Sequence, residues 1–236
     1  MMRIHIATFL IYVVAGLSRQ VIAQKVTCKE SQETILTHLL VPAGPVPTAF
    51  DPNGVYPYVS FSETSNRPEP VEYRIIILEN DRMKVTICPD LGGKVISIVL
   101  KPSGKEILYV PDVIRPTRIL SRFYFIAGGI EVSFPISHSP TQNDYVLYSI
   151  DRTADRIYVT CGERELRFGI QWSVEYSLGP VDDFLTERVV YHNPGTIAYP
   201  WMSWSNAAIP SAGDTKFDFP KGTPDIYKDK SLAPDM

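Results

Sequence analysis

An unbroken alternation of polar and apolar residues over residues 167–178 constrains the fold more than any other feature. Its even-numbered positions are apolar and its odd-numbered ones are glycine or polar. A period of two is what a β-strand with one buried face requires. Such a strand is long for a small sandwich, where about five or six residues are usual. The pattern predicts large antiparallel sheets that bury these apolar side chains together: Phe168, Ile170, Trp172, Val174, Tyr176 and Leu178.

Further runs with strand character follow one another at short spacing, separated by turns rich in Gly, Pro, Asn and Asp. Such a series of about ten short strands is typical of a sandwich or barrel. We therefore predict an all-β, antiparallel β-sandwich over residues 71–210, with 145–150 paired to 156–161 and 167–178 paired to 184–191. The other runs are residues 71–79, 83–88, 94–100, 107–110, 123–126, 130–134 and 198–207.

The two flanks of this region have a different character. Residues 24–70 are rich in proline and are expected to be irregular, with residues 31–40 forming either a short helix or an edge strand. Residues 211–236 read as a loop-like tail with little apolar mass. A sandwich that ended there would lack closing strands, which favours a truncated copy of a longer domain.

The N-terminus has the order of features found in a secretory signal. Arg3 precedes an apolar run at residues 6–16, and residues 21 and 23 supply the small residues at −3 and −1 of a cleavage point before Gln24. We expect residues 1–23 to be a signal peptide and the mature protein to be secreted or periplasmic. The alternative is a buried strand or helix. No other segment is long enough to span a bilayer, so no membrane span is expected in the mature chain.

Charge and cysteine content exclude several classes of function. The net charge is −3 and no block of Lys and Arg occurs, so no nucleic-acid partner is expected. Cys28, Cys88 and Cys161 lack the spacing of a zinc site. Export would permit one disulfide, but Cys88 and Cys161 each end a predicted strand, which favours buried free thiols. The sequence leaves the oligomeric state open.

Glu131 and His138 are the candidate catalytic residues. In its strand Glu131 shares a face with Ser133, opposite Ile130, Val132 and Phe134. Glycines precede it, so another backbone or a ligand can approach closely. A carboxylate and an imidazole around one bend can divide general-base and general-acid work. The alternative is a solvated glutamate with a surface histidine bonded to its own loop.

Four further residues are candidates for binding a substrate. In a regular strand Trp201 and Trp204 point to opposite sides, so one is expected in the core and the other on the free face beside Asn206. An exposed ring stacks on the apolar face of a sugar while an amide bonds its hydroxyls. The alternative buries both rings. Arg122 offers bidentate bonds to a carboxylate or diol, although such arginines are more often surface partners.

No arrangement of Ser, His and Asp, no phosphate-binding loop and no metal-ligand cluster can be argued from the sequence, so neither a cofactor nor a metal is expected. Several motifs, taken in order, nevertheless resemble family 5107 of the domains of unknown function, placed in the galactose-mutarotase-like superfamily. They are residues 54–58 (GVYPY), 78–80 (LEN), 88–94 (CPDLGGK), 128–131 (GGIE), 134–135 (FP), 138–140 (HSP) and 204–208 (WSNAA).

The resemblance implies a β-supersandwich whose concave sheet binds carbohydrate. If the domain is catalytic, the class implied is an aldose epimerase or a glycoside-processing enzyme, with Glu131 as base and His138 as acid. The alternatives are a non-catalytic carbohydrate-binding module and a structural or protein-interaction sandwich. Fold analogy alone does not select among them.

Overall fold

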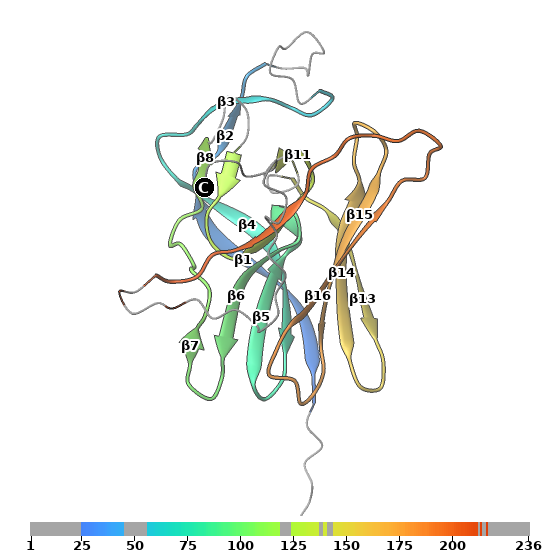
Figure 1. The fold of residues 1–236 in the computed structure, drawn as a ribbon. Coiled ribbons are helices and arrows are strands. Elements are labelled where there is room, and N and C mark those ends of the chain that lie inside the picture. Colours follow the sequence, from blue (N-terminus) through green and yellow to red (C-terminus); the bar gives the residue numbers. More distant parts are fainter. Residues whose placement is uncertain are drawn as a thin grey trace, which may run out of the picture.

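The fold is known from a computed structural model that describes residues 25–44, 56–118, 124–136, 139–140, 144–211, 213 and 216. Within these residues almost all regular structure is antiparallel β-sheet, with a short 3₁₀ helix at Pro89–Leu91. Two large sheets lie beside each other (Figure 1) and bury a common core. The predicted all-β antiparallel sandwich is therefore confirmed.

The larger sheet has the strand order β1-β4-β5-β6-β10-β17, with the short β7 paired to β6. Its outer strand β1 pairs with β4 along its whole length, and its other outer strand β17 pairs with β10. The strands are β1 (Thr27–Thr37), β4 (Glu69–Glu79), β5 (Met83–Cys88), β6 (Lys94–Leu100), β7 (Lys105–Glu106), β10 (Ile130–Ser133) and β17 (Trp204–Ala207).

The smaller sheet is a meander in chain order, β13-β14-β15-β16. Its pairings confirm two predictions, since β13 pairs with β14 and β15 pairs with β16. The orange-red chain after β16 then crosses to the larger sheet (Figure 1), where β17 completes it. The four strands are β13 (Leu147–Arg152), β14 (Ile157–Arg164), β15 (Gln171–Leu178) and β16 (Thr186–His192).

Three two-stranded ribbons complete the described elements. β8 (Pro116–Arg118) pairs with β9 (Tyr124–Ile126), and this ribbon follows the long connection from β7. The others are β2 (Leu40–Pro42) with β3 (Phe61–Thr64), and β11 (Pro135–Ile136) with β12 (Ser139–Pro140).

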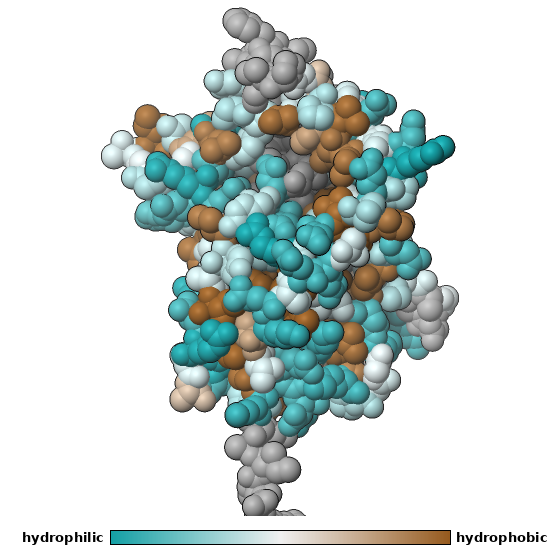
Figure 2. All heavy atoms as spheres, turned by 180° about the vertical axis from the view of Figure 1, so that it is seen from behind, coloured by the Kyte–Doolittle hydropathy of each residue, from teal (hydrophilic) through white to brown (hydrophobic). Residues whose placement is uncertain are grey.

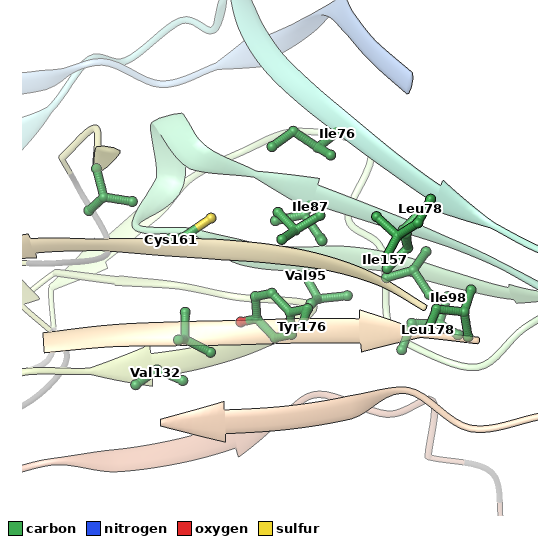
Figure 3. Close-up of a cluster of buried hydrophobic side chains, with 14 of the residues drawn as sticks. Ile76, Leu78, Ile87, Val95, Ile98, Val132, Ile157, Cys161, Tyr176 and Leu178 are labelled. Atoms are coloured by element: carbon green, nitrogen blue, oxygen red, sulfur yellow. The ribbon is translucent and has the colours of Figure 1, made fainter. Parts of the chain in front are cut away.

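The main core fills the space between the two sheets. Side chains of the larger sheet face those of the smaller one (Figure 3). Cys88 and Cys161 are both buried free thiols, as one of the two alternatives predicted, and Cys28 is free and half-buried. The labelled core residues are Ile76, Leu78, Ile87, Val95, Ile98 and Val132 on one side, and Ile157, Cys161, Tyr176 and Leu178 on the other.

A second apolar cluster lies on the opposite face of the larger sheet. Ile75 belongs to it while its neighbour Ile76 belongs to the main core, as alternation along β4 requires. Ile114 and Ile126, from the connection that carries β8 and β9, cover this face. The larger sheet is thus buried on both faces near these strands, which explains why residues 75–78 are all apolar.

The expectation of an irregular segment at residues 24–70 is wrong for Thr27–Thr37, which forms strand β1, and for the short strands β2 and β3. The alternative of a short helix at residues 31–40 is excluded and the edge-strand alternative is confirmed. Most of its side chains are exposed or half-buried, so the strand has no strong apolar alternation. Its eleven residues are instead held by pairing with β4 from Thr27–Glu79 to Thr37–Glu69.

The predicted strand at residues 167–178 begins later, at Gln171. The buried Glu165 carboxylate accepts hydrogen bonds from the backbone amides of Arg167, Phe168 and Ile170 and so closes a turn. Gly169, at φ 72°, takes a left-handed conformation that suits this turn. Phe168 is therefore only partly buried and stacks on Tyr199, whereas the other five apolar residues are buried as predicted.

Of two other predicted strands, one is absent and one is much shorter than expected. The segment 107–110 is not a strand, and its backbone amides make isolated hydrogen bonds. The amide of Ile107 donates to the carbonyl of Ile98, and that of Tyr109 donates to the carbonyl of Ala208. Of residues 198–207 only the last four form a strand, β17. The signal predicted for residues 1–23 and most of the tail predicted for residues 211–236 lie outside the described residues.

The exposed apolar side chains come from several elements. Figure 2 shows one face of the molecule, on which apolar side chains lie among hydrophilic ones. Exposed aromatic residues include Trp201, Trp204 and Phe184. In the part of the chain that the structure describes, no helix is long and apolar enough to cross a membrane.

Candidate functional site

Glu131 is buried on the face of the larger sheet that carries the second apolar cluster. Val132 points into the main core, so alternation along β10 turns Glu131 and Ser133 to the other face, as predicted. Both are nevertheless buried, Glu131 with only 2% of its surface exposed. The alternative of a solvated glutamate is therefore wrong.

Hydrogen bonds fix the direction of the Glu131 carboxylate. Asn206 lies directly opposite on β17, and its Nδ2 donates to Glu131 Oε1 at 2.8 Å. The hydroxyl of Ser133 donates to the same oxygen at 3.3 Å. Glu131 and Asn206, which the sequence offered as separate candidates, thus form a cross-strand pair between residues 75 positions apart.

Lys94 supplies the charge that faces the other carboxylate oxygen. Its Nζ lies 3.8 Å from Glu131 Oε2, and the Lys94 side chain is only 3% exposed. The ammonium donates a hydrogen bond to the carbonyl of Ile126 at 2.5 Å and lies 5.7 Å from the centroid of the Phe125 ring. Burial lowers the pKa of Lys94 from 10.5 to about 8, and the charge of Glu131 opposes this shift.

The sequence does not predict the pairing of Lys94 with Glu131, because the two residues are far apart in the chain and Asp90 is a nearer acidic residue. Asp90 instead pairs with Arg74, whose Nε and Nη2 both donate to Asp90 Oδ1, at 3.0 Å and 2.5 Å. One feature of the sequence does indicate that Lys94 has a partner. It is the first residue of the apolar strand KVISIVL, and a buried lysine needs a partner for its charge.

A cavity of about 320 Å³ opens beside Glu131. Glu131, Asn206 and Phe125 contribute to its wall, and the rest of the wall is formed by glycine and alanine residues. The lining residues are Phe125, Gly128, Gly129, Glu131, Asn206, Ala207 and Ala208. The wall therefore combines one carboxylate and one amide with an aromatic ring and methyl groups.

The two glycines before Glu131 are required by neighbouring backbone. Both have positive φ, 90° at Gly128 and 70° at Gly129. A Cβ on Gly128 would lie 2.8 Å from the carbonyl oxygen of Tyr109, and one on Gly129 would overlap the carbonyl oxygen of Val95. The sequence left two explanations for these glycines, the close approach of another backbone or that of a ligand. The structure shows the close approach of another backbone.

The tryptophans do not divide between core and surface as expected, because both are partly exposed. Trp204 is 38% exposed and lies opposite Ser133, on the same face as Glu131 and Asn206. Trp201 is 49% exposed and packs against Phe134 and Tyr191, on the other side of β10. The chain leaves the extended conformation at residues 198–203, so the strict alternation assumed for this segment does not hold.

The structure thus brings Glu131, Asn206 and Trp204 to one face and separates Trp201 from them. His138 and Arg122 lie outside the described residues. No group of three His, Cys, Asp or Glu side chains is arranged to hold a metal ion in the described part of the chain. The described residues offer a ligand the carboxylate of Glu131 and the amide of Asn206, which are fixed beside apolar surface.

A separate group of acidic residues lies at the end of β14. Burial, followed by the charge of Asp144, raises the pKa of Glu163 from 4.5 to about 7. Glu165, two residues on, is committed to the turn after β14 through its three backbone hydrogen bonds. The titration of Glu163 therefore makes the stability of the fold depend on pH.

Comparison with known proteins identifies a family but no activity. The model of the family DUF5107, described as a domain of unknown function, matches residues 50–234. A TPR-domain containing protein from Parabacteroides distasonis ATCC 8503 is 70% identical, with a TM-score of 0.77 over 83% of this chain. This chain spans 34% of the length of that protein. A second structure, of HI1317, is 14% identical over 45% of this chain and 41% of its own, with a TM-score of 0.34.

Proposed function

The chain belongs to the DUF5107 family, and we propose that it binds carbohydrate at the cavity beside Glu131. The observation that carries this proposal is a buried carboxylate, held by Asn206, in the wall of a cavity of about 320 Å³. A carboxylate and an amide together accept and donate the hydrogen bonds that vicinal hydroxyls offer. Phe125, Ala207 and Ala208 supply apolar surface for the C–H face of a sugar.

The size of the cavity favours a small ligand. Sites for small molecules usually occupy about 300–1,000 Å³, and this cavity is at the lower end of that range. A single sugar unit, free or at the end of a chain, is therefore the proposed ligand. Trp204, partly exposed on the same face, is the proposed platform for an adjoining unit.

The choice of sugar as the ligand class also rests on the resemblance of the chain to the galactose-mutarotase-like superfamily. In the catalytic form of the proposal Glu131 acts as base and His138 as acid in an aldose epimerase or a glycoside-processing enzyme. In the non-catalytic form the same cavity serves a carbohydrate-binding module. We further propose that the protein acts in a secreted or periplasmic setting, following the signal-like N-terminus.

The test compares Glu131→Gln with Glu175→Gln in the purified chain. Both changes remove one carboxylate charge from a strand, but Glu175 lies opposite Arg188 on the smaller sheet. A panel of monosaccharides is screened by thermal shift, and the best ligand is titrated by calorimetry. We expect Glu131→Gln to weaken binding by roughly 1.5–3 kcal/mol, about 10- to 150-fold, through a lost charge-assisted hydrogen bond.

The result against the proposal is unchanged affinity in Glu131→Gln, or no sugar that stabilises the wild-type protein. Polarimetry for mutarotation and an assay for released reducing sugar distinguish an enzyme from a binding module. If the site is catalytic, turnover in Glu131→Gln falls by about 10²–10⁴-fold, far more than binding does.

A further inference from the structure

A second cavity, of about 240 Å³, lies between the end of β1 and the ribbons β2–β3 and β8–β9. Phe125 on β9 lines the cavity beside Glu131, whereas its neighbour Ile126 lines the second one, so alternation along β9 separates the two. They share no lining residue. The described wall of the second cavity is largely apolar and contains no Asp, Glu, Lys or Arg: it consists of Thr37, His38, Leu39, Leu40, Phe61, Tyr73, Leu91, Ile114, Pro116 and Ile126.

His38 reaches this cavity with its ring held in one direction. Only 9% of the residue is exposed, and its backbone amide donates to the carbonyl of Ile114 at 2.9 Å. The ring nitrogen Nδ1 lies 2.6 Å from the carbonyl oxygen of Ser65. Because a carbonyl only accepts hydrogen bonds, Nδ1 carries the proton. Ser65 is fixed in turn, since its hydroxyl accepts a hydrogen bond from the amide of Leu39 at 2.9 Å.

The other ring nitrogen of His38, Nε2, is left as an acceptor. In a neutral imidazole that is protonated at Nδ1, Nε2 carries the lone pair. Within the described residues the His38 side chain makes no second hydrogen bond and no ion pair. A carbonyl that holds Nδ1–H fixes the tautomer and so presents Nε2 to a partner. A molecule that enters the cavity with a hydrogen-bond donor can therefore pair with this nitrogen.

Tyr73 adds a second acceptor to the same wall. The hydroxyl of Thr37 donates to the carbonyl of Ile35 at 3.1 Å, and its oxygen lies 3.0 Å from the hydroxyl oxygen of Tyr73. A threonine hydroxyl has only one proton to donate, so Tyr73 donates to Thr37 and keeps no proton of its own for a ligand. The polar side chains of the wall thus accept hydrogen bonds, and the ligand must supply the donor.

The volume of the second cavity suits a single ring. An apolar cavity of about 150 Å³ in another protein holds benzene, and the cavity beside His38 is larger, at about 240 Å³. The rings of Phe61 and Tyr73 contribute to its wall, and aromatic side chains pack favourably against an aromatic ligand. The remaining apolar side chains of the wall exclude a ligand with several polar groups, because those groups would lose their hydrogen bonds to water.

We propose that the second cavity binds a small phenol, whose hydroxyl donates a hydrogen bond to Nε2 of His38. A phenol supplies the one donor that the wall requires and an aromatic ring for its apolar part. A ligand of the same shape without a donor leaves Nε2 unpaired, which is unfavourable in a largely apolar cavity. This site is separate from the cavity beside Glu131, and the inference does not rest on the proposed carbohydrate function.

The first experiment determines the tautomer of His38 without a ligand. The full chain is labelled with ¹⁵N at histidine, and the two ring nitrogens of His38 are assigned by their absence in His38→Asn. At pH 8 we expect the proton on Nδ1 and none on Nε2. A proton on Nε2 overturns the inference, because the nitrogen that faces the ligand would then be a donor.

The second experiment titrates the protein with phenol and with toluene, which has a methyl group in place of the hydroxyl. Phenol should move the ¹⁵N resonance of Nε2 upfield and reach saturation, as a new hydrogen bond to this nitrogen requires, whereas toluene should not. Cyclohexanol, a weaker donor without an aromatic ring, should bind less tightly than phenol. No saturable effect of phenol at His38, or equal binding of cyclohexanol, contradicts the proposal.

The third experiment compares His38→Asn with His192→Asn. An asparagine amide can replace Nδ1 as the donor to Ser65 but has no equivalent of Nε2, and His192 is an exposed residue on β16 that serves as the control. The ratio of phenol affinity to toluene affinity should fall about 3- to 10-fold in His38→Asn and stay unchanged in His192→Asn. An unchanged ratio in His38→Asn overturns the inference.

Two provisions keep the outcomes separate. If His38→Asn does not fold, the ¹⁵N titrations of the wild type decide, and an Nε2 resonance that responds equally to phenol and toluene counts against the inference. If no sugar binds at the cavity beside Glu131, the proposed function fails while the phenol measurements still decide the role of His38.

Discussion

Replacing Gly129 with alanine should destabilise the protein far more than the same change at Gly104. The two glycines have nearly the same backbone conformation, with φ of 70° and 66°. Their surroundings differ, because a Cβ at Gly104 has no atom within 4 Å. At Gly129 it would overlap the Val95 carbonyl oxygen and lie 3.2 Å from the Cα of Ile96.

The expected magnitudes follow from two separate effects. An L-residue in the left-handed region costs about 1–2 kcal/mol, and both variants bear this cost. Forcing an extra methyl group into packed surroundings adds about 1–3 kcal/mol at Gly129 alone, since the obstacle is the backbone of β6. We therefore expect losses of about 1–2 kcal/mol for Gly104→Ala and about 2–5 kcal/mol for Gly129→Ala.

Urea denaturation followed by tryptophan fluorescence measures both losses in parallel. The comparison is valid where the m-value is unchanged, because the shift in midpoint then reports stability. Equal midpoints for the two variants would refute the reasoning that contact with the Val95 backbone requires glycine at position 129. That result would favour the other explanation of these glycines, which is the close approach of a ligand.

Three further outcomes are expected. Trp172→Ala should cost about 3–5 kcal/mol in the free energy of unfolding, because the ring is buried between the sheets; a loss below about 1 kcal/mol is a surface-like result and contradicts that placement. Glu165→Gln should lower the thermal midpoint by weakening charge-assisted bonds to three backbone amides, and a melt identical to the wild type contradicts this. The pKa of Glu163 is about 7 in the folded protein, above the ordinary value of 4.5, so the folded state binds more protons and the free energy of unfolding falls as the pH rises from 4.5 to 7. Thermal melts of Glu163→Gln should lack this part of the pH dependence, and a pH dependence equal to that of the wild type contradicts the assignment.

The main features of the fold are local enough to be predicted from the sequence. The alternation that buries Trp172, Val174 and Tyr176 is repeated every second residue, and turn residues separate β13 from β14 and β15 from β16. Strand β1 is different, because an edge strand held mainly by its backbone needs few apolar side chains. The turn at Glu165 likewise depends on one buried carboxylate, which no periodicity reveals.

The candidate site was predictable only in part. The face of Glu131 follows from alternation, and its glycine neighbours were conspicuous, but the burial of Glu131 depends on strands from elsewhere in the chain. Its contacts with Asn206 and Lys94 join three strands that are neighbours in the sheet but lie far apart in the sequence. Trp201 was misplaced because the chain around it is not extended.

The pairing of β10 with β17 also dictates when the candidate site can form during synthesis. Glu131 and Asn206 are 75 residues apart, and at about 5–20 residues per second the ribosome needs roughly 4–15 seconds to make that interval. Until Asn206 emerges, β10 has no β17 beside it and presents an open sheet edge, the kind of surface on which unfinished chains aggregate. A nascent chain that has passed Glu131 therefore has the carboxylate but no candidate site, and its exposed edge is where a chaperone would be expected to bind.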